Sequence, residues 1–215
     1  MEIRRTANAG VLLKLDGISI LMDGVCREIK PYPATPPEER AAICASYPDM
    51  VCYTHSHKDH YDPSFAAEYE KQTGGVILGP GDLPGCSASM EKRTVGNVTV
   101  TPIVSRHIGK VGATISHASF IVKGSKCVWF LGDSSPTLWK DRADIPKPDV
   151  LIVPYAYTIT PSGWALTRSL GAEKVILLHM PAREEDSIGL WAATEATTAM
   201  PDALLIPAMG QTITL

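Results

Sequence analysis

The chain has 215 residues, of which 45% are hydrophobic and 20% are charged, a balance typical of one globular domain with a sizeable core. Its net charge of −3 and its pI near 6.1 argue against a nucleic-acid partner. No apolar run approaches the roughly 18 residues of a membrane span, and the first residues lack the apolar stretch of a signal peptide. The five scattered cysteines show no CxxC spacing, so we expect one cytoplasmic domain over residues 1–215 with reduced cysteines.

The first half of the chain is predicted to begin with short strands and then to alternate strands with helices. Asp16-Gly17 is a strong hairpin signal, and Gly74-Gly75 is typical of a helix end. Thr35, followed by two prolines and a glutamate, is interpreted as the N-cap of a capping box. In chain order we expect strands 2–6, 10–15 and 18–22, a helix from Thr35 to about Ser46, a strand 50–53, a helix 63–72 and a strand 76–78.

The second half is predicted to begin with β structure and then to alternate again. A Gly/Pro-rich stretch, 79–88, separates it from the first half and is expected to be irregular. The further elements are strands 89–95, 97–104, 117–122, 126–131 and 150–153, a helix beginning at Thr160-Pro161, a strand 175–178, a helix 185–199 and strands 204–206 and 212–214.

The segment 54–60 reads Thr-His-Ser-His-Lys-Asp-His and places three imidazoles and a carboxylate within six positions. A short apolar strand precedes it, and Asp62-Pro63 follows it as a helix N-cap with proline at the first helical position. A tight strand-to-helix loop lets alternate side chains converge on one point, as a metal ion requires. A tag or an adventitious metal binder is the alternative, but this segment is internal and has ordered flanks.

Three more candidate ligands, His107, Asp133 and His179, each follow a predicted strand. Together with the histidine-rich segment they resemble the His-x-His-x-Asp-His signature and the later ligands of the metallo-β-lactamase superfamily. The resemblance covers essentially the whole chain. It implies an α/β fold, a four-layer αββα sandwich, with helices on the outer faces of two stacked sheets and the metals at one loop-rich end. The order of the expected strands and helices fits that fold.

Carried over residue by residue, the resemblance implies a dinuclear metal site. One ion would be held by His55, His57 and His107, the second by Asp59, His60 and His179, and Asp133 would bridge the two. Imidazole and carboxylate suit zinc, the expected metal, and also manganese, iron or nickel. Two such ions can share a water and lower its pKa towards ~7, which gives hydroxide at neutral pH.

His117 is placed near the metal end by hairpin arithmetic. If 123–126 is a turn, antiparallel pairing sets Asp133 roughly opposite Ser116 or His117. His117 could then bind substrate, donate a proton or replace His107 as a ligand. It could also simply pack within its strand. His107 is the preferred ligand because it ends the longer β run.

Asp23 is placed by the same arithmetic. Pairing about Asp16-Gly17 sets Asp23 near Gly10, where the carboxylate could anchor a histidine of the metal loop, because ligating histidines need an outer acceptor. An aspartate at this place is usual in the superfamily. Capping of a turn is the competing interpretation.

Aromatic side chains follow the strand 150–153. Tyr155, Tyr157 and Trp164 could wall a pocket on the metal side or pack in the core.

We expect a dinuclear metal-dependent hydrolase with Asp59 and His117 as candidate catalytic residues. Metal-bound hydroxide would attack a small ester, lactone or phosphodiester, and Asp59 or a bound water would handle the proton. The compact length and the segment Asn8–Leu12 resemble the ascorbate-6-phosphate lactonase-like branch. The alternatives are a nuclease acting on nucleic acid and a non-catalytic metal-binding sensor. A small-molecule substrate is expected as the partner, and a homo-oligomer is compatible with the sequence.

Overall fold

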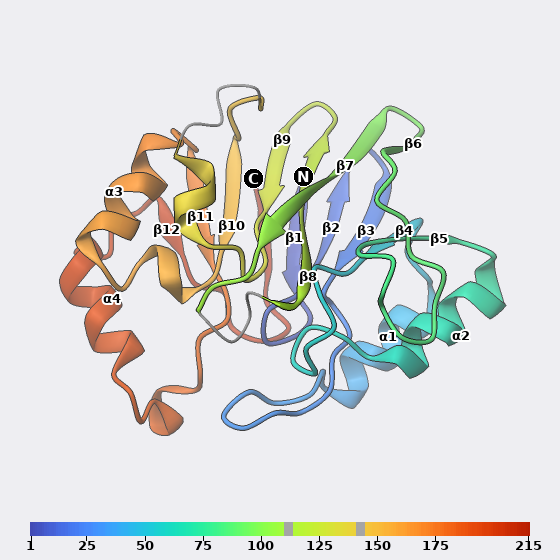
Figure 1. Ribbon diagram of the computed structural model, residues 1–215, viewed down its shortest axis with the longest axis horizontal. Helices are drawn as coiled ribbons and strands as arrows, with labels where there is room; N and C mark the ends of the chain where they lie inside the picture. The colour runs from blue at the N-terminus through green and yellow to red at the C-terminus, as the bar shows by residue number, and fades with distance from the viewer. Residues whose placement is uncertain (110–113, 141–144) are drawn as a thin grey trace.

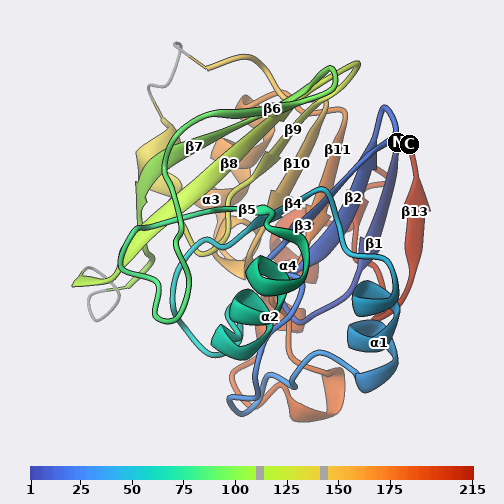
Figure 2. The same cartoon turned by 90° about the vertical axis from the view of Figure 1, so that its right-hand side faces the viewer.

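Two β-sheets pack face to face in the computed structural model, which describes residues 1–109, 114–140 and 145–215 (Figures 1 and 2). The first sheet has the order β13-β1-β2-β3-β4-β5. Its strands are β13 (Thr212–Thr214), β1 (Glu2–Arg5), β2 (Val11–Leu15), β3 (Ile18–Met22), β4 (Met50–Cys52) and β5 (Val76–Leu78). Strands β3, β4 and β5 run parallel, so their carboxyl ends meet at one edge.

The second sheet has the order β12-β11-β10-β9-β8-β7-β6. Its strands are β12 (Leu204–Leu205), β11 (Lys174–Leu177), β10 (Val150–Val153), β9 (Cys127–Phe130), β8 (Ser116–Lys123), β7 (Val98–Arg106) and β6 (Arg93–Val95). Strands β9 to β12 are parallel, whereas β6 to β9 form an antiparallel meander. The carboxyl ends of β9, β10 and β11 therefore also share an edge.

Helices cover the outer face of each sheet. Figure 1 shows α1 (Pro37–Ala45) and α2 (Pro63–Thr73) beside the first sheet, with α3 (Pro161–Ser169) and α4 (Leu190–Thr198) beside the second. This arrangement is the predicted four-layer αββα sandwich, the metallo-β-lactamase fold. Within the described ranges, no helix combines the length and the apolar character that crossing a membrane needs.

Three apolar layers hold the sandwich together, one between the sheets and one under each pair of helices. Because side chains alternate along a strand, neighbours on β9 serve different layers. Phe130 packs between the sheets with Leu13, whereas Trp129 packs outward with Trp164 of α3. On the other side, Phe65 of α2 packs in the layer beneath α1 and α2. Burying each such large side chain contributes about 1.5–3 kcal/mol, so the inner sheets form the stable frame of the site.

The helix predicted over 185–199 begins later than expected, at Leu190. Gly189 adopts a left-handed backbone with φ 76°, which interrupts helical geometry before that residue. The carboxylate of Asp186 accepts hydrogen bonds from the backbone N–H groups of Leu190 (2.9 Å) and Trp191 (2.8 Å). A cap provided from four residues upstream is a tertiary feature that the periodicity of the sequence does not show.

Two further expectations near loops are wrong. The side chain of Thr35 does not cap α1, whose N-cap is Pro36. The Thr35 hydroxyl instead accepts a hydrogen bond from the backbone N–H of Cys26 at 2.9 Å and so closes a loop. The strand expected over 89–95 is reduced to β6, with an isolated bridge at Ser89.

The close approach of Gly10 to the end of β3 gives a stability prediction. Val11 pairs with Met22, so Gly10 lies beside Asp23, as the hairpin arithmetic predicted. A Cβ on Gly10 would lie 1.9 Å from the backbone oxygen of Asp23. We expect Gly10→Ala to lower the free energy of unfolding by about 2–3 kcal/mol, because the two strand ends must separate. Urea denaturation measures this loss.

Gly81→Ala is the matched control, since a Cβ there meets nothing within 4 Å. It should change the free energy of unfolding by no more than about 0.5 kcal/mol. Equal stability of the two variants would contradict the steric argument.

Candidate metal site

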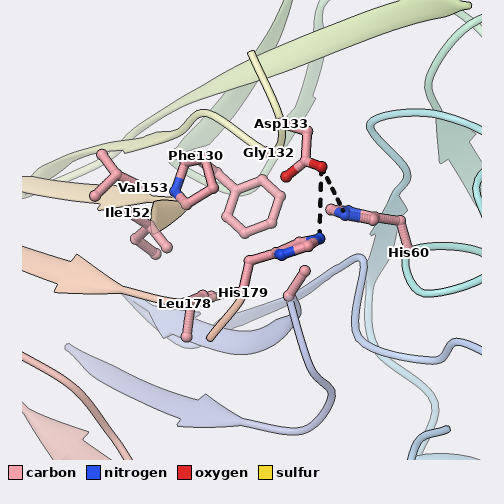
Figure 3. Close-up of a pocket in the computed structure, with 10 residues that line it drawn as sticks. His60, Phe130, Gly132, Asp133, Ile152, Val153, Leu178 and His179 are labelled. Atoms are coloured by element: carbon pink, nitrogen blue, oxygen red, sulfur yellow. Dashed lines mark ion pairs between the residues drawn. The ribbon is translucent and has the colours of Figure 1, made fainter. Parts of the chain in front are cut away.

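All seven predicted ligands lie at the edge where the carboxyl ends of the parallel strands meet. The loop after β4 contributes four of them, and the segments after β7, β9 and β11 contribute one each: His55, His57, Asp59 and His60, then His107, Asp133 and His179. Figure 3 shows three of these side chains, from three different segments, pointing toward one another. The topology thus gathers residues that are up to 124 positions apart in the chain (55 to 179).

The carboxylate of Asp133 lies at the centre of the group. Its Oδ2 atom is 3.5 Å from the Nε2 atoms of His60, His107 and His179. A second carboxylate, that of Asp59, lies 3.0 Å from Nε2 of His179. One oxygen that is equally distant from three imidazoles has the geometry of a group shared between neighbouring cation positions.

Three sets of side chains have ligand atoms within 4.8 Å of one another: His55, His57 and His107; His55, His60 and Asp133; and Asp59, His60 and His179. The first and third sets are the two ligand groups that the resemblance implied. The middle set takes one histidine from each and adds Asp133, as a bridging carboxylate would.

Unpartnered buried atoms show that a cation fits this site. Among the described residues, Nε2 of His60, Nε2 of His107 and Oδ1 of Asp133 are buried without a hydrogen-bond partner. Leaving such an atom unsatisfied costs about 1–3 kcal/mol. Imidazole nitrogen and carboxylate oxygen are ligands of borderline divalent ions, so bound ions would remove this cost.

Hydrogen bonds at the far ring nitrogens set which nitrogen faces the centre. Nδ1 of His60 donates to the carboxylate of Asp23 at 2.8 Å, and Nδ1 of His107 donates to the carbonyl of the next residue at 2.6 Å. The Thr54 hydroxyl donates a hydrogen bond to the Asp23 carboxylate at 2.6 Å, so it accepts one from Nδ1 of His55 at 2.9 Å. In all three rings Nε2 therefore carries a lone pair, the form that binds a metal.

Asp23 anchors the metal loop, which confirms the first of its two predicted roles. Its fully buried carboxylate accepts three hydrogen bonds, from the backbone N–H of Thr54 (2.8 Å), the Thr54 hydroxyl (2.6 Å) and His60 (2.8 Å). Asp23 and His179 both adopt left-handed backbone conformations, with φ 47° and 58°. Such strain at non-glycine residues persists only where surrounding contacts impose it, and it clusters at functional sites.

Electrostatics favour neutral imidazoles at His55 and His57 and a charged carboxylate at Asp133, whereas at His60 burial is outweighed by Asp133 and Asp23, which raise its pKa well above the usual value. Burial lowers the pKa of His55 well below its usual value, and it lowers the pKa of His57 in the same direction. For Asp133, burial alone would raise the pKa, but His179 and His60 hold it well below the usual range. Metal binding needs neutral imidazoles and an ionised carboxylate, so binding at His60 would release a proton, whereas His55, His57 and Asp133 are already in the required states.

His117 lies beside the site but outside the three sets. It pairs with Ser105 across β7 and β8, and its ring centroid is 5.0 Å from that of His55 and 5.7 Å from that of His107. Burial lowers the pKa of His117 to about 3. The hairpin arithmetic is thus confirmed in placing His117 at the metal end, and His107 is the histidine that joins His55 and His57.

Two tyrosines flank His179. The ring of Tyr32 meets the His179 ring edge-on with centroids 4.3 Å apart, and Tyr155 lies 5.6 Å away on a tilted plane. Tyr155 therefore lies on the metal side, whereas Tyr157 and Trp164 belong to the outer core. Sequence reasoning missed Tyr32, because its proline-flanked segment has neither a strand nor a helix pattern.

A cavity of about 340 Å³ opens beside Tyr32. Its wall is mixed in charge, because it includes Lys30 as well as Glu28 and Glu185. A pocket of this size suits a small molecule, since ligand pockets are typically about 300–1,000 Å³.

The comparisons with known proteins agree with this fold. A family model described as a β-lactamase superfamily domain matches residues 2–176. No protein with a curated description matches the chain in sequence. An isothiocyanate hydrolase from Delia radicum gut bacteria has 16% identity and a TM-score of 0.72, covering 100% of this chain and 99% of that one. A possible metal-dependent hydrolase from Veillonella parvula has 18% identity and a TM-score of 0.73, with coverage of 100% and 99%.

A third similar structure is CmlA, a diiron β-hydroxylase from Streptomyces venezuelae, with 16% identity and a TM-score of 0.68. It covers 100% of this chain and 54% of the longer CmlA chain. A hydrolase and a β-hydroxylase on one scaffold show that this fold alone does not determine the reaction. The family match, however, spans most of the chain, and the predicted superfamily is confirmed. The chain belongs to the β-lactamase superfamily.

Proposed function

We propose that this protein is a dinuclear metal-dependent hydrolase acting on a small ester, lactone or phosphodiester. The observation that carries the proposal is the set of buried, unpartnered ligand atoms, which converge from four segments of the chain. A structural metal site closes with four ligands. Seven converging ligands exceed that number and favour two ions with catalytic use.

The proposed ligand sets follow the groups of side chains whose ligand atoms lie within 4.8 Å of one another. His55, His57 and His107 would hold one ion, Asp59, His60 and His179 the other, and Asp133 would bridge them. Zinc is the first choice, and manganese, iron and nickel suit the same ligands. When bound, the ions would lower the pKa of a water in the site and polarise the bond to be cleaved.

Asp59 is the proposed proton acceptor. Its carboxylate lies 3.0 Å from His179 and keeps a small exposed fraction, 8% of its side chain, whereas the His60 side chain beside it has none. A carboxylate that keeps some exposure can take the proton of an attacking water and pass it on to the leaving group.

A small substrate is favoured by the walls of the site. The rings of Tyr32 and Tyr155 both lie next to His179, and the cavity beside Tyr32 is mixed in charge. Nucleic acid would need a basic stripe, which the net charge of −3 does not favour. Because one protein of similar fold is named an isothiocyanate hydrolase, that electrophile also belongs among the test substrates.

Metal content tests the dinuclear site. We expect protein purified without chelator to bind two ions per chain, as measured by elemental analysis. His57→Ala should lose about one ion, because it belongs to one set alone, and Asp133→Ala should lose both because its carboxylate faces both sets. A wild-type content of one ion, or an Asp133→Ala variant that keeps two, would contradict the bridging role.

Asp23→Asn tests anchoring separately from ligation. The variant keeps every ligand but loses the carboxylate that accepts from His60, so metal affinity should fall by ~10–100-fold, the range typical of outer contacts. Competition with a chromogenic chelator measures the affinity. At saturating metal the variant should still bind two ions, and complete loss would mean that Asp23 acts on the fold.

Turnover tests the reaction class. We expect the metal-loaded protein to hydrolyse at least one member of a panel of chromogenic esters and lactones, an aryl isothiocyanate and bis-p-nitrophenyl phosphate. Chelation should abolish the activity, and added zinc or manganese should restore it. A protein that holds two ions and cleaves nothing in the panel would favour the non-catalytic sensor, and salt-dependent RNA binding would favour the nuclease.

A further inference from the structure

A buried series of hydrogen bonds runs from His117 to the backbone of Leu131, directly after β9. Nδ1 of His117 lies 2.7 Å from the Ser105 hydroxyl, which lies 3.0 Å from the Ser119 hydroxyl. The Ser119 hydroxyl donates to the carbonyl of Leu131 at 2.8 Å. The three side chains are at least nine-tenths buried, so water does not complete these contacts.

The hydroxyl protons available along this series of hydrogen bonds determine the tautomer of His117. A carbonyl can only accept, so the one hydroxyl proton of Ser119 goes to Leu131. The contact between the serines then needs the proton of Ser105, and Nδ1 of His117 must be the donor to Ser105. The Ser105 hydroxyl also lies 3.5 Å from the His117 carbonyl. If Ser105 donates to that carbonyl instead, Nδ1 of His117 is still the donor to Ser105.

The other ring nitrogen of His117, Nε2, consequently carries a lone pair that has no hydrogen-bond donor among the described residues. Nε2 is buried and, within the part of the chain that the structure describes, accepts no hydrogen bond. The neighbouring rings of His55 and His107 also turn lone pairs inward, because their Nδ1 atoms are donors. Nε2 of His55 has a donor in Nδ1 of His57 at 2.9 Å, whereas among the described residues Nε2 of His107 and Nε2 of His117 have none, so the occupant must bring both a cation and a hydrogen-bond donor.

We propose that His117 accepts a hydrogen bond from an O–H or N–H of what binds beside the His55, His57 and His107 group, and that Ser105 and Ser119 are positioning residues that hold it in this tautomer. The proposal rests on the proposed function only for the identity of the donor, which is the attacking water or the substrate. It replaces the proton-donor role considered from the sequence, because an Nε2 without hydrogen has nothing to donate.

Histidine tautomers test the proposal without any turnover. In long-range proton–nitrogen NMR spectra of full-length, zinc-loaded protein labelled with nitrogen-15 at histidine, we expect His117 to show a protonated Nδ1 and an unprotonated Nε2. The His117→Gln spectrum assigns the signals. Ser105→Ala removes the acceptor and should give a measurable fraction of the Nε2–H form. Ser116→Ala, an exposed neighbour on β8, should not. An Nε2–H tautomer in the wild type overturns the proposal.

Cadmium-113 distinguishes an acceptor from a metal ligand. In cadmium-loaded protein, we expect nitrogen–cadmium coupling at Nε2 of His55 and His107 and none at His117. Coupling at His117 would make it an additional ligand and would overturn the acceptor role. If no histidine shows coupling, the proposed metal site is contradicted, but the tautomer of His117 still stands on its own measurement. Failure of the proposed function and failure of the acceptor role are therefore distinguishable.

Kinetics on whichever panel substrate is cleaved identify the donor. His117→Phe removes the acceptor and should lower kcat/KM by ~10–100-fold, whereas His117→Gln keeps an acceptor in its amide oxygen and should lose less. If the donor is water, kcat falls for every substrate. If it is a substrate group, the loss vanishes for an analogue in which that group is methylated. Equal activity of His117→Phe and wild type, with both metals retained, contradicts the proposal.

Discussion

The buried carboxylate of Asp23 is the contact on which the geometry of the site depends. Burial raises its pKa, and a buried carboxylate without partners would be costly. Three donors offset that cost, two from Thr54 and one from His60. Because the Thr54 hydroxyl donates its hydrogen bond to Asp23, it can only accept one from His55. One carboxylate at the end of β3 thus orients two rings on the loop after β4.

Sheet topology supplies the rest of the convergence. Strands β3 and β4 are parallel neighbours in one sheet, as are β9, β10 and β11 in the other. In such sheets binding sites form beyond the carboxyl ends of the strands. Stacking the two sheets brings both edges together, so that Asp133 from one faces His60 from the other at 3.5 Å. The backbone N–H of His179 donates to the carbonyl of Asn8 at 3.2 Å, which ties the end of β11 to the segment between β1 and β2.

The parts of this site that depend on short segments of sequence could be predicted. The histidine-rich loop, the strand ends before His107 and Asp133, and the neighbourhood of Asp23 all follow from spacing and hairpin register, which short segments determine. The late start of α4 and the position of Tyr32 could not be predicted in that way. Each depends on a contact between segments, Asp186 with the first turn of α4 and the Tyr32 ring with His179. Proton positions are equally hidden, because a tautomer depends on all the partners of a ring at once.

The two halves of the proposed site differ in charge, and that difference bears on how one fold can serve several reactions. His55, His57 and His107 form a set of neutral nitrogens, whereas the other set includes the carboxylate of Asp59. With Asp133 shared by both, an ion whose other ligands are neutral would keep more of its charge, and would polarise a substrate more strongly, than one that also faces Asp59. The lone pair of His117 lies on the neutral side, next to His55. In the proposed site, the side with the greater polarising power would therefore also be the side that accepts a hydrogen bond, so that a ligand there would be oriented by both its electron-rich atom and its donor.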